Sequence, residues 1–454
     1  MQNDARPARR TLARHDFEEP DMIRPFLRHA TLGLATILSA ALIAVGCGGD
    51  DDDDNGGNGG SGGDDTSQIT ASDEPATGDI VLCMGKDTSG IHRPTLAKFN
   101  AANPDANATL VELPESADEQ RTQLVQRLRA ESDECDVLAL DVIWTAEFAA
   151  QDWLADVSQL VDDRKDEFIE STLATGEFED KYFAVPFNSN AGFVYYRTDQ
   201  VDEVPETWEA LYEEANEYNG LTYQGSRYEG LTVHFLELLY SAGGEVLNDD
   251  GSESTADADT TREVLQFMVD GIEDGAVPRA TLTYKEEEAR RAFEAGTVTF
   301  MRNWPYAYSL GQDVPAIKGK FEVAPFPAFG DSDAASVLGG YNLAVSSYSD
   351  NEEGAAALIN FLTAMEAQVN YGANATPPVL TAAYDDKAVT DALPFAEVLR
   401  DSIEQGRSRP VSPVYPQISE AISTNVYSAL SGDATVDAAV KKMDEDITKA
   451  LATF

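Results

Sequence analysis

The sequence predicts an α/β fold in which a parallel or mixed sheet carries helices on both faces. From about residue 78 onward, short apolar runs alternate with stretches of helical spacing, which is typical of βαβ units. Polar or aromatic residues follow three successive apolar runs, and ligands of such sheets bind at the carboxyl ends of the strands. With 454 residues, of which 43% are hydrophobic, the chain can bury the cores of two or three domains.

The first block of elements contains three strands and two helices. Each strand is an apolar run or an alternating segment of strand length, and each helix has apolar residues three or four positions apart. The predicted elements are 79–84, 92–103, 108–113, 117–132 and 136–140. The strands lead into Lys86 and Asp87, into Glu115, and into Asp141, so these side chains are expected at one edge of the sheet.

The second block begins near residue 182 and ends in several helices. We predict strands at 193–196, 297–302 and 338–345, and helices at 206–217, 232–242, 260–271, 286–295, 353–371, 389–405, 416–430 and 435–451. Trp304 and Tyr341 stand beside a Pro or Gly bend at a strand end, which favours a binding role over burial in the core. Trp153 and Trp208 lie inside helical patterns and are expected in the core. Trp144 fits either role.

Cys83 and Cys135 are expected to be buried thiols. Cys83 falls near the end of one predicted strand, whereas Cys135 precedes the start of another. If these strands are parallel neighbours, the two residues are separated by roughly 15 Å along the strands, which is too far for a disulfide.

The N-terminal region has the pattern of an exported lipoprotein. Residues 30–46 are uncharged and mostly apolar and follow Arg24 and Arg28, as in a signal peptide, although an uncleaved anchor is the alternative. The end of this run, Ala-Val-Gly-Cys, resembles a bacterial lipobox and makes Cys47 the expected lipidation site. We expect Met22 to be the true start, so that 1–21 would not be translated. Residues 48–75, rich in Gly and Asp, are expected to form a disordered tether.

The charge balance argues against nucleic acid as a partner. The chain has 81 acidic and 32 basic residues and a formal net charge of -49, which repels phosphates. Such an excess fits a salt-rich habitat that screens the charge. A general acidic bias of the genome explains it equally well.

Six segments carry a resemblance to a known family: LAKFNAANPDANATLVELPES, DVLALDVIWTAEFAAQDWLADV, YFAVPFNSNAGFVYYRTD, AFEAGTVTFMRNWPYAY, LGGYNLAVS and RPVSPVYPQIS. They resemble the family 1 extracellular solute-binding proteins of ABC importers, and most closely their trehalose/maltose-binding lipoproteins. The resemblance implies a hinged, two-lobe, periplasmic-binding-protein-like fold of type II with discontinuous lobes. Lobe 1 would hold 76–187 and 337–374, and lobe 2 would hold 190–335 and 375–454. The hinge crossings would lie near Asn188 and Val337.

The resemblance also implies a sugar site between the lobes. Asp141 would accept sugar hydroxyls, Trp304 and Tyr341 would stack on the sugar, and Arg409 would donate, although Arg409 in a surface salt bridge is the alternative. Asn190 stands where relatives commonly have Asp. The further ligand-binding residues expected on this basis are Lys86, Asp87, Glu115 and Gly340.

The function implied is capture of a neutral oligosaccharide, such as the α-glucosides trehalose or maltose, for an ABC permease. The protein would be a monomer on the outer face of the cell membrane, anchored by lipidated Cys47, without cofactor, metal or catalytic residues. Neither His92 nor His234 belongs to a zinc motif, and the sequence has no phosphate loop or nucleophile elbow. The alternatives are a glycan-binding adhesion lipoprotein and a secreted glycosidase, which needs only two carboxylates.

Overall fold

The computed structural model of the chain describes residues 69–70, 74–87, 90–114 and 117–453. The predicted signal region 1–47 with Cys47, most of the tether predicted at 48–75, and Glu115 lie outside these residues. In the described part of the chain, no helix combines the length and the apolar character that crossing a membrane requires.

The first sheet is mixed and, within the described residues, has five strands in the order β2-β1-β3-β11-β6. Strands β1, β2 and β3 are parallel, whereas β11 runs antiparallel to both β3 and β6. Its strands are β1 (Gly78–Met84), β2 (Ala106–Glu112), β3 (Val137–Asp141), β6 (Val185–Asn190) and β11 (Gly339–Val345). Alternate residues of β3 enter different cores: Val137 and Ala139 belong to one, and Leu138 and Leu140 to the other.

The second sheet has four strands in the described residues, in the order β10-β7-β9-β8. They are β7 (Phe193–Tyr196), β8 (Leu221–Thr222), β9 (Phe300–Asn303) and β10 (Glu322–Ala324), and a small hairpin is formed by β4 (Glu177–Phe178) and β5 (Lys181–Tyr182). Only Ala191 and Gly192 separate β6 of the first sheet from β7 of the second. The chain returns from the second sheet to the first between β10 and β11.

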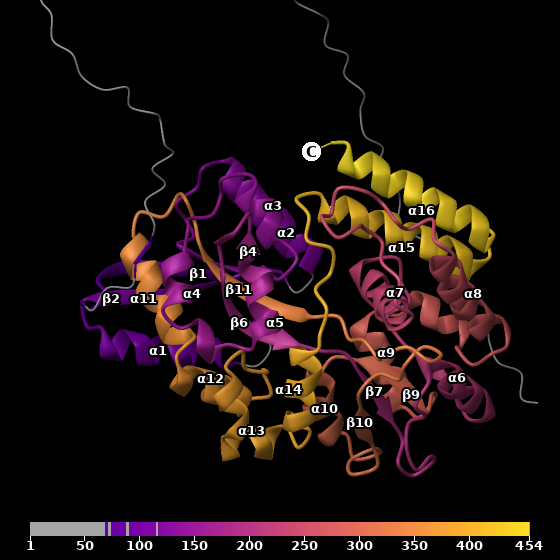
Figure 1. Cartoon of the computed structure of the whole chain (residues 1–454). Coiled ribbons are helices and arrows are strands. Elements are labelled where there is room, and N and C mark those ends of the chain that lie inside the picture. Colours follow the sequence, from indigo (N-terminus) through magenta and orange to yellow (C-terminus); the bar gives the residue numbers. More distant parts are fainter. Residues whose placement is uncertain (1–68, 71–73, 88–89, 115–116, 454) are drawn as a thin grey trace, which may run out of the picture. The chain divides into compact units, whose positions relative to one another are not determined.

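Helices surround both sheets (Figure 1). In the first half of the chain they are α1 (His92–Ala102), α2 (Ala117–Arg129), α3 (Thr145–Ala149), α4 (Ser158–Asp162), α5 (Glu170–Leu173), α6 (Trp208–Glu217) and α7 (Glu229–Ser241). In the second half they are α8 (Asp259–Glu273), α9 (Glu286–Glu294), α10 (Tyr306–Gln312), α11 (Glu352–Leu362), α12 (Met365–Gly372), α13 (Lys387–Ala392), α14 (Ala396–Glu404), α15 (Tyr415–Ser431) and α16 (Val436–Leu451).

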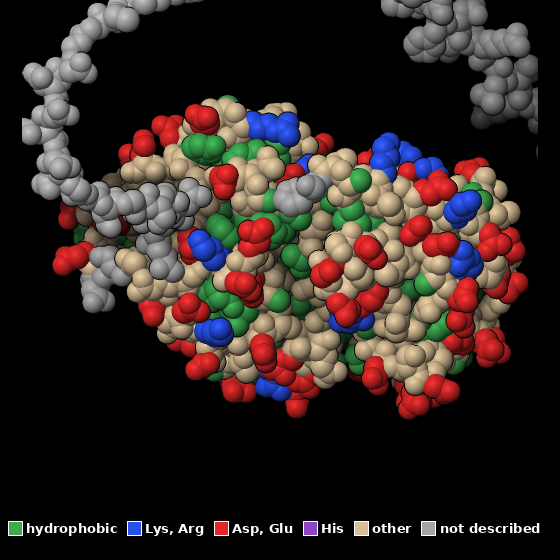
Figure 2. All heavy atoms as spheres, turned by 45° about the horizontal axis from the view of Figure 1, so that its top comes forward, with side chains coloured by type: hydrophobic (Ala, Val, Ile, Leu, Met, Phe, Trp, Pro, Cys, Tyr) green, Lys and Arg blue, Asp and Glu red, His purple; other side chains and the backbone are tan. Residues whose placement is uncertain are grey.

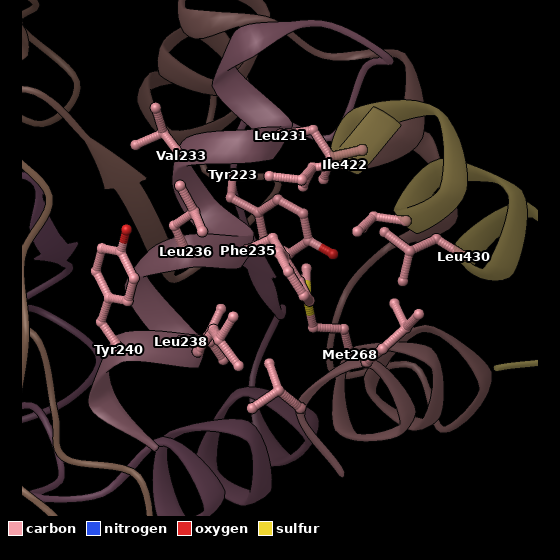
Figure 3. Close-up of a cluster of buried hydrophobic side chains, with 14 of the residues drawn as sticks. Tyr223, Leu231, Val233, Phe235, Leu236, Leu238, Tyr240, Met268, Ile422 and Leu430 are labelled. Carbon is pink, nitrogen blue, oxygen red and sulfur yellow. The ribbon is translucent and has the colours of Figure 1, made fainter. Parts of the chain in front are cut away.

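The two C-terminal helices pack on α7 and α8. Helix α7 is buried along its whole length, because it lies between the second sheet and these helices. Figure 3 shows its Leu231 and Phe235 among Met268 of α8 and Ile422 and Leu430 of α15. These contacts between distant segments form the largest apolar core of the described residues.

Two helices that the sequence predicts as continuous are each broken in two. In the predicted helix 353–371, α11 ends at Leu362, Ala364 is extended, and α12 begins at Met365. At the break, Arg164 donates to the carbonyl oxygen of Thr363 at 2.8 Å and to its hydroxyl at 3.0 Å. The predicted helix 389–405 is interrupted by Pro394, which disfavours helical backbone at the residue before it.

The prediction of two buried thiols is wrong, because Cys83 and Cys135 form a disulfide with 5.7 Å between their Cα atoms. Their strands are parallel neighbours as expected, and Cys83 lies opposite Leu138. The prediction placed Cys135 in line with β3, but the chain bends at Glu134 and Asp136, on either side of Cys135. Both cysteines are buried in the same apolar core.

Candidate functional site

Asp141 and Tyr341 lie opposite each other at the point where β3 ends beside β11. Asp141 follows buried strand residues and is itself half-buried. Its Oδ1 accepts from the backbone N–H of Ile143 at 3.2 Å. The backbone N–H of Tyr341 donates to Asn188 Oδ1 at 2.7 Å, and its hydroxyl donates to Gln120 Oε1 at 3.4 Å. The strand pairing thus presents a carboxylate beside a half-buried aromatic ring.

Arg409 links Asp141, at the end of β3, to Glu229, at the start of α7. Its side chain is 3% exposed and makes ion pairs with Asp141 Oδ1 at 3.0 Å and Glu229 Oε1 at 2.8 Å. Glu229 begins α7 and also accepts from the hydroxyls of Tyr415, at 2.6 Å, and Ser419. The surface salt bridge considered from the sequence is therefore wrong, since the pair is buried.

Burial and charge act against each other in this ion pair. Burial raises the pKa of Glu229 above its ordinary value, although Arg409 and the Ser419 and Tyr415 hydroxyls work in the opposite direction. Burial alone would lower the pKa of Arg409, but the charges of Asp141 and Glu229 outweigh it and raise the pKa. The guanidinium therefore remains charged, and its two Nη atoms are bound to Glu229 and Asp141.

Trp304 approaches β11 from the second sheet. It follows the end of β9 and is half-buried, and its carbonyl oxygen accepts from the Tyr195 hydroxyl at 2.7 Å. Two carbons of its ring lie 3.1 Å from where a Cβ on Gly339 would stand. Gly339 pairs with Asn190, so Trp304 and Asn190 both lie beside Gly339, two residues before Tyr341 in β11.

Gly340, which lies between Gly339 and Tyr341, must be glycine. Its φ is 119°, and an added Cβ would lie 2.1 Å from the carbonyl oxygen of Asn188. The bend expected from the sequence is thus present, and it places Tyr341 opposite Asp141.

Lys86 and Asp87 lie on the loop after β1, at the same carboxyl edge of the first sheet. Lys86 is exposed. The Asp87 carboxylate accepts from the backbone N–H groups of Gly90, at 2.7 Å, and His92, at 3.0 Å, and so holds the start of α1. These bonds give Asp87 a role within its own loop. These local bonds account for an aspartate at position 87 without a contact to Asp141.

Sequence reasoning missed Glu229 and a buried ion pair between Arg302 of β9 and Glu237 of α7. A signal for the second was present, since Arg302 follows Phe300 and Met301 in a strand and Glu237 is surrounded by leucines in its helix. Charges in such apolar segments are buried only when they are paired. For Glu229 the sequence carried no comparable signal.

A small pocket adjoins Arg409. It is lined by Val142, Ile143, Ala146, Thr175, Glu177, Leu338, Ser408, Arg409, Pro410 and Val411. Acidic side chains are scattered over the face seen in Figure 2. In the described part of the chain, no group of three or more His, Cys, Asp or Glu side chains is arranged to hold a metal ion.

Residues 85–369 match the family of bacterial extracellular solute-binding proteins. A probable ABC transporter-binding protein of Deinococcus radiodurans is 33% identical over 363 residues, which cover 75% of this chain and 86% of that protein. The chain belongs to the bacterial extracellular solute-binding proteins. The family resemblance stated from the sequence is therefore confirmed.

Solved structures of solute-binding proteins share the fold. Maltose-bound T. maritima MalE3 is 34% identical, with a TM-score of 0.76, and the match covers 82% of this chain and 99% of that one. The GacH receptor of Streptomyces glaucescens is 22% identical, with a TM-score of 0.75 and coverage of 83% and 99%. The prediction of an α/β, two-lobe fold of the periplasmic-binding-protein type is confirmed.

Proposed function

We propose that this solute-binding protein captures a neutral oligosaccharide, an α-glucoside disaccharide such as trehalose or maltose, for an ABC importer. The observation that carries the proposal is the ion pair of Arg409 with Asp141, opposite Tyr341, together with the Trp304 ring against Gly339, two residues before Tyr341. The 34% identity to a maltose-bound protein of the same family supports a sugar as ligand.

These residue types suit the chemistry of a pyranose. A sugar ring has an apolar face that packs on aromatic rings such as Trp304 and Tyr341, and a rim of hydroxyls that both donate and accept. Asp141 would accept from hydroxyls through Oδ2, since the hydrogen bonds it receives from the described residues end at Oδ1. Arg409 would donate. Each charge-assisted hydrogen bond contributes about 1.5 to 3 kcal/mol net.

The ligand would lie between two lobes that close by hinge rotation. Lobe 1 would hold 76–187 and 337–374, and lobe 2 would hold 190–335 and 375–454. Two features support the crossings proposed near Asn188 and Val337. Two residues separate the end of β6, in the first sheet, from the start of β7, in the second sheet. The chain crosses back to the first sheet between β10 and β11. A ligand that contacts both lobes favours the closed arrangement.

Delivery would take place at the outer face of the cell membrane. Lipidated Cys47 would anchor the chain, residues 48–75 would act as the tether, and the monomer with its sugar bound would be recognised by the permease. Because neutral sugars are indifferent to long-range fields, the net charge of -49 does not hinder their capture.

A thermal-shift screen followed by calorimetry tests the proposal. A ligand with a micromolar dissociation constant, present at about 1 mM, stabilises the folded state by about 4 kcal/mol, so trehalose or maltose should raise the melting temperature by roughly 5 °C. Cellobiose, a β-glucoside, is the matched control and should have a smaller effect. The sugar should be recovered unhydrolysed. A shift caused only by amino acids or peptides would contradict the proposal, and turnover of the sugar would point to a glycosidase.

A further inference from the structure

A charged pair is completely buried beneath the Trp304 ring. The side chains of Arg302 on β9 and Glu237 on α7 both have 0% exposure. Arg302 Nε donates to Glu237 Oε2 at 2.9 Å, and Nη2 donates to Oε1 of the same carboxylate. Arg302 Nη1 donates to Gln224 Oε1 at 3.0 Å. The guanidinium is therefore held on several sides by groups that are themselves buried.

The guanidinium of Arg302 lies against the indole of Trp304. Its central carbon is 4.0 Å from the ring centroid. Arg302 lies in β9, and Trp304 directly follows the end of this strand. Trp is the aromatic side chain that binds cations best, and the attraction is larger where water is excluded. One edge of the ring also abuts Gly339.

Stability alone does not account for a buried pair at this position. Replacing a buried ion pair by apolar residues of similar volume is often neutral or stabilising, because both charges must lose their hydration. The pair instead fixes the orientation of the Arg302 guanidinium, because a two-pronged contact between Arg and a carboxylate allows only one orientation of the guanidinium plane. Glu237 also lies at the crossing between the sheets, where its Oε1 is 2.7 Å from the position of a Cβ on Gly192.

We propose that Arg302 is a positioning residue that holds the Trp304 indole in the orientation in which it receives the sugar, and that Glu237 orients Arg302. The role of the ring as a sugar contact rests on the proposed function. The orientation of the ring does not, so it can be tested without ligand.

The test compares three variants of the full chain. Arg302→Met removes the charge but leaves Glu237 buried without its partner, so Arg302→Met/Glu237→Leu is made as the variant expected to keep the fold. Arg302→Lys retains a cation but not the two-pronged contact. Arg197→Met, which removes an ion pair with Asp199 at the far end of β7, is the matched control.

The first measurement is acrylamide quenching of Trp304 in the ligand-free protein, taken as the difference between each variant and the same variant carrying Trp304→Phe. In the Arg302→Met/Glu237→Leu protein the quenching constant should rise by about twofold, because the released ring adopts further rotamers. Arg302→Lys should restore part of the difference, and Arg197→Met should leave it unchanged. Unchanged quenching in the folded double variant would overturn the proposal.

The second measurement is the affinity for trehalose or maltose, whichever the wild-type protein binds. The double variant should bind about tenfold more weakly, which is the size expected of a desolvated cation–π contact. Unchanged affinity would overturn the proposal. If the wild-type protein binds neither sugar, the proposed function fails, but the quenching result still decides whether Arg302 positions the ring.

Discussion

Replacing Asp141 by Asn should weaken sugar binding by about tenfold. The substitution keeps the size of the side chain and an acceptor for the Ile143 N–H, but removes the charge that faces Arg409 and the ligand. Hydrogen bonds to a charged group contribute about 1.5 to 3 kcal/mol, against about 0.5 to 1.5 kcal/mol for neutral groups. The difference of about 1.5 kcal/mol corresponds to a factor of about ten in the dissociation constant.

The same substitution should also lower the free energy of unfolding, by about 1 kcal/mol. Arg409 would be left with one charged partner, Glu229, in a site where its side chain is 3% exposed. The cost stays modest because the second ion pair of Arg409 remains. Urea denaturation measures this loss separately from the change in affinity.

Asp136 provides the matched control, because it precedes the same strand at the opposite end. Its carboxylate accepts from the Val81 N–H at 2.7 Å and from the Ser349 hydroxyl at 2.6 Å. Asp136→Asn should reduce stability by about 2 kcal/mol and leave affinity unchanged. Calorimetry with the sugar that the wild-type protein binds would refute the reasoning if Asp141→Asn changed the affinity by less than about twofold. An equal loss of affinity in Asp136→Asn would refute it as well.

Three further predictions concern stability. Replacing Cys83 and Cys135 by Ala should lower the free energy of unfolding by about 4 kcal/mol, because their separation of 52 residues closes a long loop; equal urea midpoints with and without the disulfide would contradict this. Burial lowers the pKa of His234 below 6.5, so the unfolded chain binds a proton there that the folded protein does not. The free energy of unfolding should therefore fall as the pH drops below about 6.5, by at most about 1.4 kcal/mol per pH unit for this group. His234→Phe should reduce this dependence on pH, and an unchanged dependence would contradict the prediction. Raising NaCl from about 0.1 M to about 1 M shortens the screening length from about 10 Å to about 3 Å and should raise the melting temperature, given the net charge of -49; a fall would contradict this.

Local patterns were sufficient to predict the strands β1, β2, β3, β7, β9 and β11, but not the shorter strands of the sheets or β6. They also singled out several positions of the candidate site. Asp141 stood out because a carboxylate that follows four apolar strand residues needs a partner, and Trp304 because it precedes Pro305 at a strand end. The glycines before Tyr341 indicated a bend, and φ at Gly340 is 119°. Each of these signals lies within a few residues of the position it concerns.

Features that depend on distant segments could not be predicted in this way. Arg164 binds Thr363, at the break after α11, across 199 residues, and Glu229 meets Arg409 across 180 residues. The disulfide was missed for a local reason. The prediction assumed that the two strands are parallel neighbours, which they are, but it did not include the bends on either side of Cys135. Periodicity indicates which face of an element is buried, but not which residue of another element lies against it.

A crystal structure with trehalose or maltose tests the central claim most directly. The sugar should lie with a ring face on Trp304 and with hydroxyls within hydrogen-bonding distance of Asp141 and Arg409. A sugar bound elsewhere, with these three side chains free of ligand contacts, would contradict the account.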